Sequence, residues 1–236
     1  PYQDPQAVSA ALSFVRHYKP GIVFVLGDLL DFYQLSRFDR NPERAANLQG
    51  ELDEARELLY TIRRTAKKSR VVLIQGNHEY RLRRYLWNQA PELSGLRGLK
   101  IEALLSLDKL KVEYVESGML HFTGIVVKHG NIVRGKSGLT ATAELERLGV
   151  SGVSGHSHRA GQIYKTNVAG MYSWTECGCL CDLAPEYMEG QIPDWQHALA
   201  YRTSETDGNR FEIHLAPIIK GKIEYGGGWV CFKKKG

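Results

Sequence analysis

Side chains that commonly bind metal ions are gathered in four short segments of this sequence. Each segment contains glycine, which permits the tight turns that let short polar side chains approach one ion. The candidates are Asp28 and Asp31, Asn77 and His78, His129, and His156 and His158. Mixed carboxylate, amide and imidazole ligands suit Mn²⁺, iron or Zn²⁺ better than Mg²⁺ or Ca²⁺, which prefer oxygen ligands alone. These residue types therefore predict a site for divalent metal ions.

Each of these segments follows a run of residues typical of a buried β-strand. The predicted strands cover residues 22–26, 71–74, 125–128 and 150–153. Apolar periodicity and composition favour helices over residues 4–19, 42–68 and 137–148. Alternating helices and strands predict parallel pairing with crossover helices, which brings the ends of the strands to one edge of a sheet. We therefore expect the candidate ligands to meet at that edge.

The composition is typical of a folded α/β protein. Of the 236 residues, 43% are hydrophobic and 24% are charged, close to the averages for globular chains. Further short strands are expected at residues 162–166, 171–174, 198–203 and 211–215, and lysines 233–235 are interpreted as a solvated tail. We see no internal repeat and no linker, so the sequence predicts a single domain over residues 1–236.

The sequence also bears on location and partners. Its longest clean apolar run, residues 22–26, is far shorter than the ~18 to 20 residues that span a bilayer. No secretory signal pattern opens the chain. We therefore expect a cytoplasmic protein with no membrane partner, while the oligomeric state stays open. A net charge of +5 permits nucleic acid or a nucleotide as a partner without requiring it.

Three of the four cysteines alternate along one short stretch, at Cys177, Cys179 and Cys181. On a strand, residues at i and i+2 point the same way. We interpret the three as reduced thiols. Zinc is the alternative, but structural zinc sites usually show C-x₂₋₄-C pairs with a second pair elsewhere, and only Cys231 remains.

The four segments, in order, resemble the calcineurin-like metallophosphoesterases. That family carries G-D-x-x-D, G-N-H-E/D, H-G and G-H-x-H, which correspond here to residues 27–31, 76–79, 129–130 and 155–158. The resemblance covers roughly the first 160 residues, and the later stretch around residues 176–182 and 194–196 is similar to phage-encoded members. It implies an α/β fold of two stacked mixed β-sheets flanked by helices.

The resemblance also implies roles for individual residues. Asp28 would bridge two divalent ions, most simply Mn²⁺, with iron, Zn²⁺ and Ni²⁺ as alternatives. Asn77, His129 and His156 would complete one metal site, and His158 would contribute to the other. His78 would face the substrate as the catalytic histidine. Asp31 and Glu79 would orient the ligand imidazoles.

One motif of the family is absent from the sequence. No D-x-H precedes Gly27, since the chain opens Pro1-Tyr2-Gln3-Asp4. We expect that the chain begins shortly after that motif and its strand. The alternative is a degenerate member with one metal site.

The resemblance implies hydrolysis of phosphoester bonds by a hydroxide that the two metal ions generate. Protein Ser/Thr phosphatases of the superfamily carry arginine after the second Asp of G-D-x-x-D, where this chain has Phe32. That difference and the mild basicity favour a phosphodiesterase or nuclease. Phosphomonoester hydrolysis and a non-catalytic binding module are the alternatives. Arg37 and Arg81 are candidates for phosphate contact.

A rival pattern lies between the third and fourth segments. Residues 130–137 read G-x-x-x-x-G-K-S, the phosphate-cradling loop of nucleotide hydrolases. It arrives after more than half of the chain, and the residues between its glycines are bulky. We therefore disfavour an ATPase.

Overall fold

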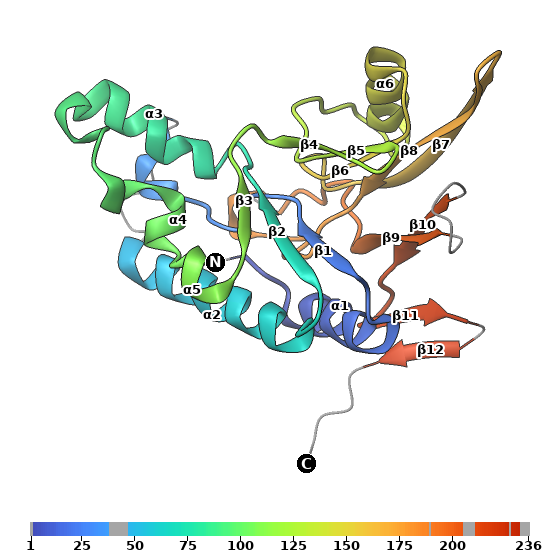
Figure 1. Cartoon of the computed structure of the whole chain (residues 1–236), viewed down its shortest axis with the longest axis horizontal. Coiled ribbons are helices and arrows are strands. Elements are labelled where there is room, and N and C mark those ends of the chain that lie inside the picture. The colour runs from blue at the N-terminus through green and yellow to red at the C-terminus, as the bar shows by residue number, and fades with distance from the viewer. Residues whose placement is uncertain (1, 38–46, 189, 205–210, 227, 232–236) are drawn as a thin grey trace. The chain divides into compact units, whose positions relative to one another are not determined.

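The computed structural model describes residues 2–37, 47–188, 190–204, 211–226 and 228–231. It divides into two compact units, unit 1 of residues 19–118 and unit 2 of residues 2–18 and 119–236. Both units contain helices and strands, which confirms the predicted mixed α/β class (Figure 1). Lysines 233–235, interpreted as a tail, lie outside the described residues.

Unit 1 is built on a parallel three-stranded sheet. Its strands lie in the order β1 (Ile22–Val25), β2 (Arg70–Ile74) and β3 (Glu113–Val115). The central strand β2 buries four consecutive aliphatic residues, 71–74, the pattern of a parallel strand covered on both faces. The parallel pairing of β1 with β2 confirms the expected crossover connection.

Helices connect the strands of unit 1. Between β1 and β2 lie η1 (Tyr33–Leu35) and α2 (Leu48–Thr65). The side chain of Asn47 accepts hydrogen bonds from the N–H groups of Gln49 and Gly50, so α2 begins at Leu48. Residues 42–46 of the predicted helix lie outside the described residues. Between β2 and β3 lie α3 (Glu79–Gln89), η2 (Pro91–Leu93), η3 (Arg97–Leu99), α4 (Ile101–Leu104) and α5 (Leu107–Leu110).

Unit 2 contains a mixed five-stranded sheet. Its order is β4 (Met119–Phe122), β5 (Ile125–Lys128), β6 (Gly152–Ser154), β8 (Gly170–Cys177) and β7 (Ala160–Asn167). β5, β6 and β8 run parallel, while β4 and β7 pair antiparallel at the edges. Helix α6 (Leu139–Leu148) connects β5 to β6 and packs against β7 and β8 (Figure 1). The core here joins Val126, Ala141 and Leu145 to Trp174.

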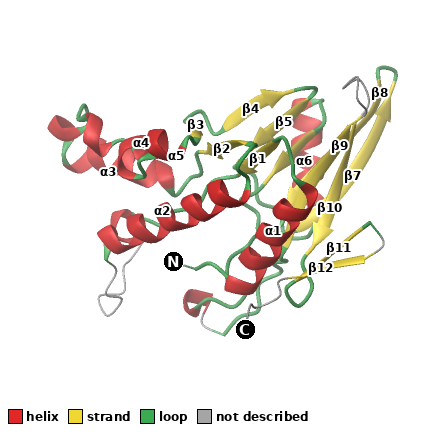
Figure 2. Ribbon diagram, turned by 60° about the horizontal axis from the view of Figure 1, so that its bottom comes forward, coloured by secondary structure: helices red, strands yellow, loops and turns green. Residues whose placement is uncertain are grey.

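Two smaller sheets complete unit 2. β9 (Ala198–Ser204) pairs antiparallel with β10 (Phe211–Pro217), and β11 (Lys222–Tyr225) pairs antiparallel with β12 (Gly228–Cys231). Helix α1 (Pro5–Tyr18) packs beside β11 and β12 (Figure 2). It buries Ala7, Ala10 and Phe14 against a second core. A short η4 (Glu186–Met188) follows β8. Among the described residues, none of the helices has the length and apolar character to cross a membrane.

Some predicted boundaries differ from those observed. α6 begins at Leu139 rather than at residue 137, because Gly138 adopts a left-handed conformation with φ 83°. β6 covers Gly152–Ser154 rather than residues 150–153. β7 and β8 extend beyond the predicted strands at both ends. The short strands β3, β4, β11 and β12 were not predicted, nor were the one-turn helices α4 and α5.

Candidate functional site

In unit 1, the segments after β1 and β2 are joined through Asp28. Asp28 has φ 53°, a left-handed conformation that Asp tolerates better than most residues. Its Oδ1 accepts a hydrogen bond from the N–H of His78 at 3.0 Å. A Cβ atom at Gly76 would lie 2.2 Å from the same Oδ1, so this position requires glycine. The G-D-x-x-D and G-N-H-E segments thus form one interlocked structure, and Asn77 lies exposed on it.

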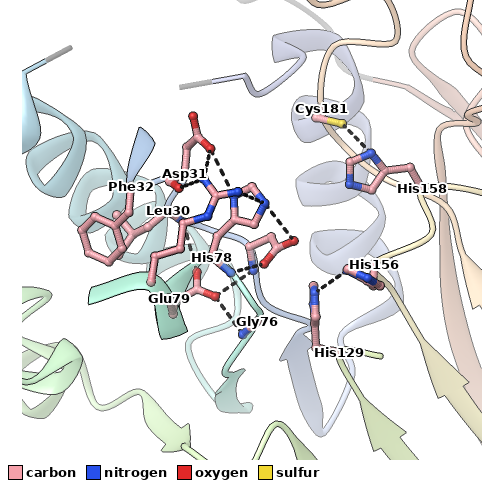
Figure 3. A network of polar contacts seen from close by, with 12 residues as sticks. Leu30, Asp31, Phe32, Gly76, His78, Glu79, His129, His156, His158 and Cys181 are labelled. Carbon is pink, nitrogen blue, oxygen red and sulfur yellow. Dashed lines mark hydrogen bonds and ion pairs between the residues drawn. The ribbon is translucent and has the colours of Figure 1, made fainter. Parts of the chain in front are cut away.

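Glu79 links these two segments through hydrogen bonds to their backbone. It is 1% exposed and accepts hydrogen bonds from the N–H groups of Asp28 at 2.9 Å, Gly76 at 2.8 Å and Leu30 at 3.1 Å (Figure 3). Burial, and then the negative charge of Asp28, raise the pKa of Glu79, while the three hydrogen bonds act in the opposite direction. Glu79 therefore positions the two loops, and its contacts are with backbone rather than with imidazoles.

Replacing Glu79 by glutamine tests this role. An amide offers one acceptor oxygen in place of two, so at least one buried N–H loses its partner, at a cost of about 1–3 kcal/mol. We expect the free energy of unfolding in urea to fall by that amount. Glu57→Gln, on an exposed position of α2, is the matched control and should leave stability unchanged. Equal stability of the two variants would contradict the positioning role.

His78 lies between the carboxylate of Asp31 and the guanidinium of Arg81. Its Nδ1 lies 3.1 Å from Asp31 Oδ1, and its Nε2 lies 3.0 Å from Nη2 of Arg81. A guanidinium can only donate, so in this arrangement Nε2 accepts from Arg81 and Nδ1–H donates to Asp31. These two contacts orient the ring, and Asp31 contacts it directly.

The two predicted phosphate-contacting arginines are placed differently. Arg81 donates from Nη1 to the backbone oxygen of Asp31 at 2.7 Å and to its Oδ1 at 3.1 Å, so it supports the loop. Arg37 is exposed and lines, with Arg84 and Tyr85, a groove of about 500 Å³ between η1 and α3. Phe32, where phosphatases carry arginine, is 1% exposed and belongs to the core.

In unit 2, His129 and His156 face each other. His129 Nε2 lies 3.1 Å from His156 Nδ1, and the ring centroids are 4.9 Å apart (Figure 3). His129 follows β5, and its backbone oxygen accepts from the N–H of Gly155 at 2.9 Å, which ties the two loops together. His156 has φ 67°, again left-handed. Two imidazole nitrogens this close can both bind a single divalent ion.

His158, the last residue of G-H-x-H, belongs to a different group of side chains. It lies with Cys179 and Cys181, and the ligand atoms of the three are within 4.8 Å of one another. The hydrogen bond from Cys179, and then that from His158, lower the pKa of Cys181 to about 5 against the effect of burial. Cys177, Cys179 and Cys181 are free thiols, as predicted. That two of them meet a histidine was not predicted.

Two buried acids support the loops and were not predicted. Glu51 of α2 accepts from the N–H of Phe32 at 2.8 Å. Glu176 of β8, fully buried, accepts from Ser157 Oγ at 2.7 Å and from the N–H groups of Gly138 at 3.0 Å and Ala141 at 2.9 Å. The position of Glu176 within a largely uncharged strand is a sequence signal that could have marked it, because a buried carboxylate needs donors, whereas Glu51 lies in a charged helical segment.

The contacts of Glu176 also bear on the G-x-x-x-x-G-K-S segment. In a phosphate-binding loop, the N–H groups at the start of the following helix face the phosphates. Here the carboxylate of Glu176 accepts from those groups, in the position that a phosphate would take. Lys136 is exposed on the preceding loop. This arrangement favours a structural role for the segment.

Lys136→Ala should accordingly have little effect. We expect a stability change within about 0.5 kcal/mol, typical of surface positions, and nearly unchanged Mn²⁺-dependent hydrolysis of a generic phosphodiester. Lys165→Ala, exposed on β7, is the matched control. An ATPase activity of the wild type that disappears in Lys136→Ala alone would restore the nucleotide-hydrolase interpretation.

Comparison with known proteins finds phage relatives. The chain is 28% identical over 239 residues to "Gene 54 protein" of Mycobacterium phage D29, covering 96% of this chain and 93% of that protein. It is 26% identical over 240 residues to "Gene 54 protein" of Mycobacterium phage L5, with the same coverage. No protein-family model matches the sequence. Phage relatives support the predicted similarity to phage-encoded proteins.

Proposed function

We propose that this chain is a metal-dependent hydrolase of phosphoester bonds. The observation that carries the proposal is the His129–His156 pair, whose ring nitrogens lie 3.1 Å apart on two interlocked loops. In unit 1, hydrogen bonds also fix Asp28. Its backbone N–H donates to Glu79, and one of its carboxylate oxygens accepts from the N–H of His78. The donor set of carboxylate, imidazole and amide suits Mn²⁺, iron, Zn²⁺ or Ni²⁺.

The proposed ligands are those that the family resemblance assigns. They are Asp28 and Asn77 of unit 1 and His129 and His156 of unit 2; the resemblance also assigns His158, whose ring lies instead with Cys179 and Cys181. Bound divalent ions would supply a hydroxide near neutral pH and neutralise charge on the phosphoryl group. We further propose the calcineurin-like fold, with two stacked mixed sheets in one domain. The five-stranded sheet of unit 2 is mixed and supports this proposal, while the three described strands of unit 1 are all parallel.

We assign to His78 one of two roles: it protonates the leaving group, or it stabilises the charge that develops in the transition state. Its contact with Asp31 fixes the ring, and its Nε2 accepts from Arg81. A proton on Nε2 requires Arg81 to move away, because a guanidinium cannot accept a hydrogen bond from it. Arg81 thus controls the availability of that nitrogen, in addition to supporting the loop.

A phosphodiester, in nucleic acid or a nucleotide, is the proposed substrate class. Phe32 is buried in the core and cannot replace the arginine that grips a phosphomonoester. The groove at Arg37 and Arg84 presents cationic side chains to an anionic chain, and the net charge of +5 acts in the same direction.

Metal removal and replacement test the proposal. Protein treated with a chelator and then dialysed should be inactive toward bis(p-nitrophenyl) phosphate, and Mn²⁺ should restore the activity. The diester should be hydrolysed faster than p-nitrophenyl phosphate. His129→Ala should lose the activity, whereas His121→Ala, an exposed histidine on β4 of the same sheet, should keep it. Wild-type protein that binds two metal ions and hydrolyses neither ester would be a binding module instead.

A further inference from the structure

We propose that His158, Cys179 and Cys181 form a zinc site in unit 2. Nδ1 or Nε2 of the histidine and the Sγ atoms of the two cysteines are within 4.8 Å of one another. The family resemblance gives His158 a metal ligand role but assigns nothing to the cysteines. The proposal does not depend on hydrolysis. All three residues lie in unit 2, and thiolates select softer ions than the carboxylate, amide and imidazole ligands of the proposed hydrolytic centre.

Backbone hydrogen bonds on both sides fix the cysteine segment. On one side, the N–H of Asp4 donates to the backbone oxygen of Leu180 at 2.9 Å, and Cys181 forms an isolated antiparallel β-bridge with Gln3. On the other side, the N–H of Cys179 donates to the backbone oxygen of Gln196 at 3.0 Å. The chain bends at Leu180, which packs against the core beside α1, and the thiols of Cys179 and Cys181 on either side of it lie close together.

A glycine separates the third cysteine from this pair. Gly178 has φ 68°, and a Cβ atom there would lie 2.4 Å from the backbone oxygen of Gln196. Its left-handed conformation interrupts the alternation that β8 would otherwise continue. Cys177 ends β8 and does not join the group of ligand atoms. Cys179 and Cys181 thus belong to one site, and Cys177 can serve as the control in mutagenesis.

His158 is fixed with its ring toward Cys181. Its backbone oxygen accepts from the N–H of Gln196 at 3.0 Å, and Trp195 packs edge-on against its ring at a centroid distance of 4.4 Å. In Figure 3, Nδ1 faces the Cys181 sulfur, at 3.8 Å. His197 Nε2 contacts the backbone oxygen of Cys181 at 2.7 Å and so helps to fix the cysteine.

The separation of Cys181 and His158 matches tetrahedral zinc coordination. Bonds of ~2.3 Å to sulfur and ~2.0 to 2.1 Å to nitrogen place a sulfur and a nitrogen ligand about 3.6 Å apart and two sulfur ligands about 3.8 Å apart. The observed separation of 3.8 Å between Cys181 Sγ and His158 Nδ1 needs almost no adjustment. The Sγ atom of Cys179 lies within 4.8 Å of Cys181 Sγ and of a ring nitrogen of His158.

The chemistry of the ligands selects the ion. Two thiolates and an imidazole favour Zn²⁺ over Mn²⁺ or Mg²⁺, because sulfur is a soft ligand. The two thiolate charges neutralise the divalent cation, and water completes the tetrahedron. His158 lies between β6 and β7 and the two cysteines follow β8, so the bound ion would link these two segments.

Cobalt substitution tests the site directly in the wild-type protein. The full chain is purified under reducing conditions without chelator, its zinc content is measured by mass spectrometry, and Co²⁺ is exchanged for zinc. We expect a zinc ion per chain and, with Co²⁺, the near-ultraviolet charge-transfer band of cobalt bound to thiolate. Absence of this band from folded wild-type protein overturns the proposal.

Serine variants identify the ligands. Cys179→Ser and Cys181→Ser should lose the band and the zinc ion, while Cys177→Ser should keep both. Loss in all three variants alike, or in none of them, overturns the assignment. Asp28→Asn should keep the band although it loses hydrolysis. A wild-type protein that shows the band but no hydrolysis would therefore refute the proposed function alone.

Discussion

Replacing Asp28 by asparagine should abolish metal-dependent phosphodiester hydrolysis while the protein stays folded. Asparagine adopts the left-handed conformation of this residue, φ 53°, as readily as aspartate. Its amide oxygen can still accept from the N–H of His78. The change therefore removes one negative charge and little else. We expect a loss at least as large as the ~10²- to 10⁴-fold that removal of a general acid or base such as His78 produces.

The measurement is the initial rate of bis(p-nitrophenyl) phosphate hydrolysis at saturating Mn²⁺, with metal content determined on the same samples. Asp53→Asn is the matched control, because Asp53 lies on the exposed side of α2 and pairs only with Arg56 and Gln49 among the contacts described. The control should retain full activity. An Asp28→Asn protein with wild-type rate and metal content would exclude Asp28 as a ligand.

Replacing Trp174 by alanine should cause the largest loss of stability. Trp174 is 0% exposed and packs in unit 2 with Val126, Ala141 and Leu145. Its Nε1–H donates to Ser154 Oγ at 3.0 Å, so the substitution also leaves that hydroxyl without its donor. Truncation of a buried tryptophan costs about 3–5 kcal/mol through lost burial and the cavity that remains. Urea denaturation should show that reduction in the free energy of unfolding.

A matched aromatic residue on the neighbouring strand provides the control. Tyr164 of β7 is 54% exposed, so Tyr164→Ala should change the free energy of unfolding by about 0.5 kcal/mol or less. The slope of the transition should be similar in both variants if each still unfolds in two states. A loss below about 1 kcal/mol in Trp174→Ala would show that this core relaxes around the cavity.

The sequence predicted best where local chemistry and local structure agree. Residues 125–128 were predicted as a strand and form β5 with the same bounds. A short β-branched run bounded by turn residues has few alternatives. The parallel pairing of β1 with β2 followed from alternation alone. The pairing of His129 with His156 was expected from two motifs 27 residues apart, and their loops are adjacent in the structure.

Features that depend on tertiary contacts were not predictable. β3 and β4 span three and four residues, too few for periodicity to identify. The cysteine run was expected to share one face throughout, but the left-handed conformation of Gly178 separates Cys177 from the other two. The role of Glu176 was not predicted, because its three hydrogen-bond donors come from residues 138, 141 and 157, which are distant from it in sequence.

The left-handed residues have a consequence for attempts to improve this protein. Asp28, His156 and His158 all have positive φ, which costs of the order of 1 kcal/mol at each non-glycine residue. Selection for thermal resistance alone would therefore favour glycine or asparagine at these three positions. Such a screen would remove the side chains that we propose as metal ligands, so stability and activity must be selected together.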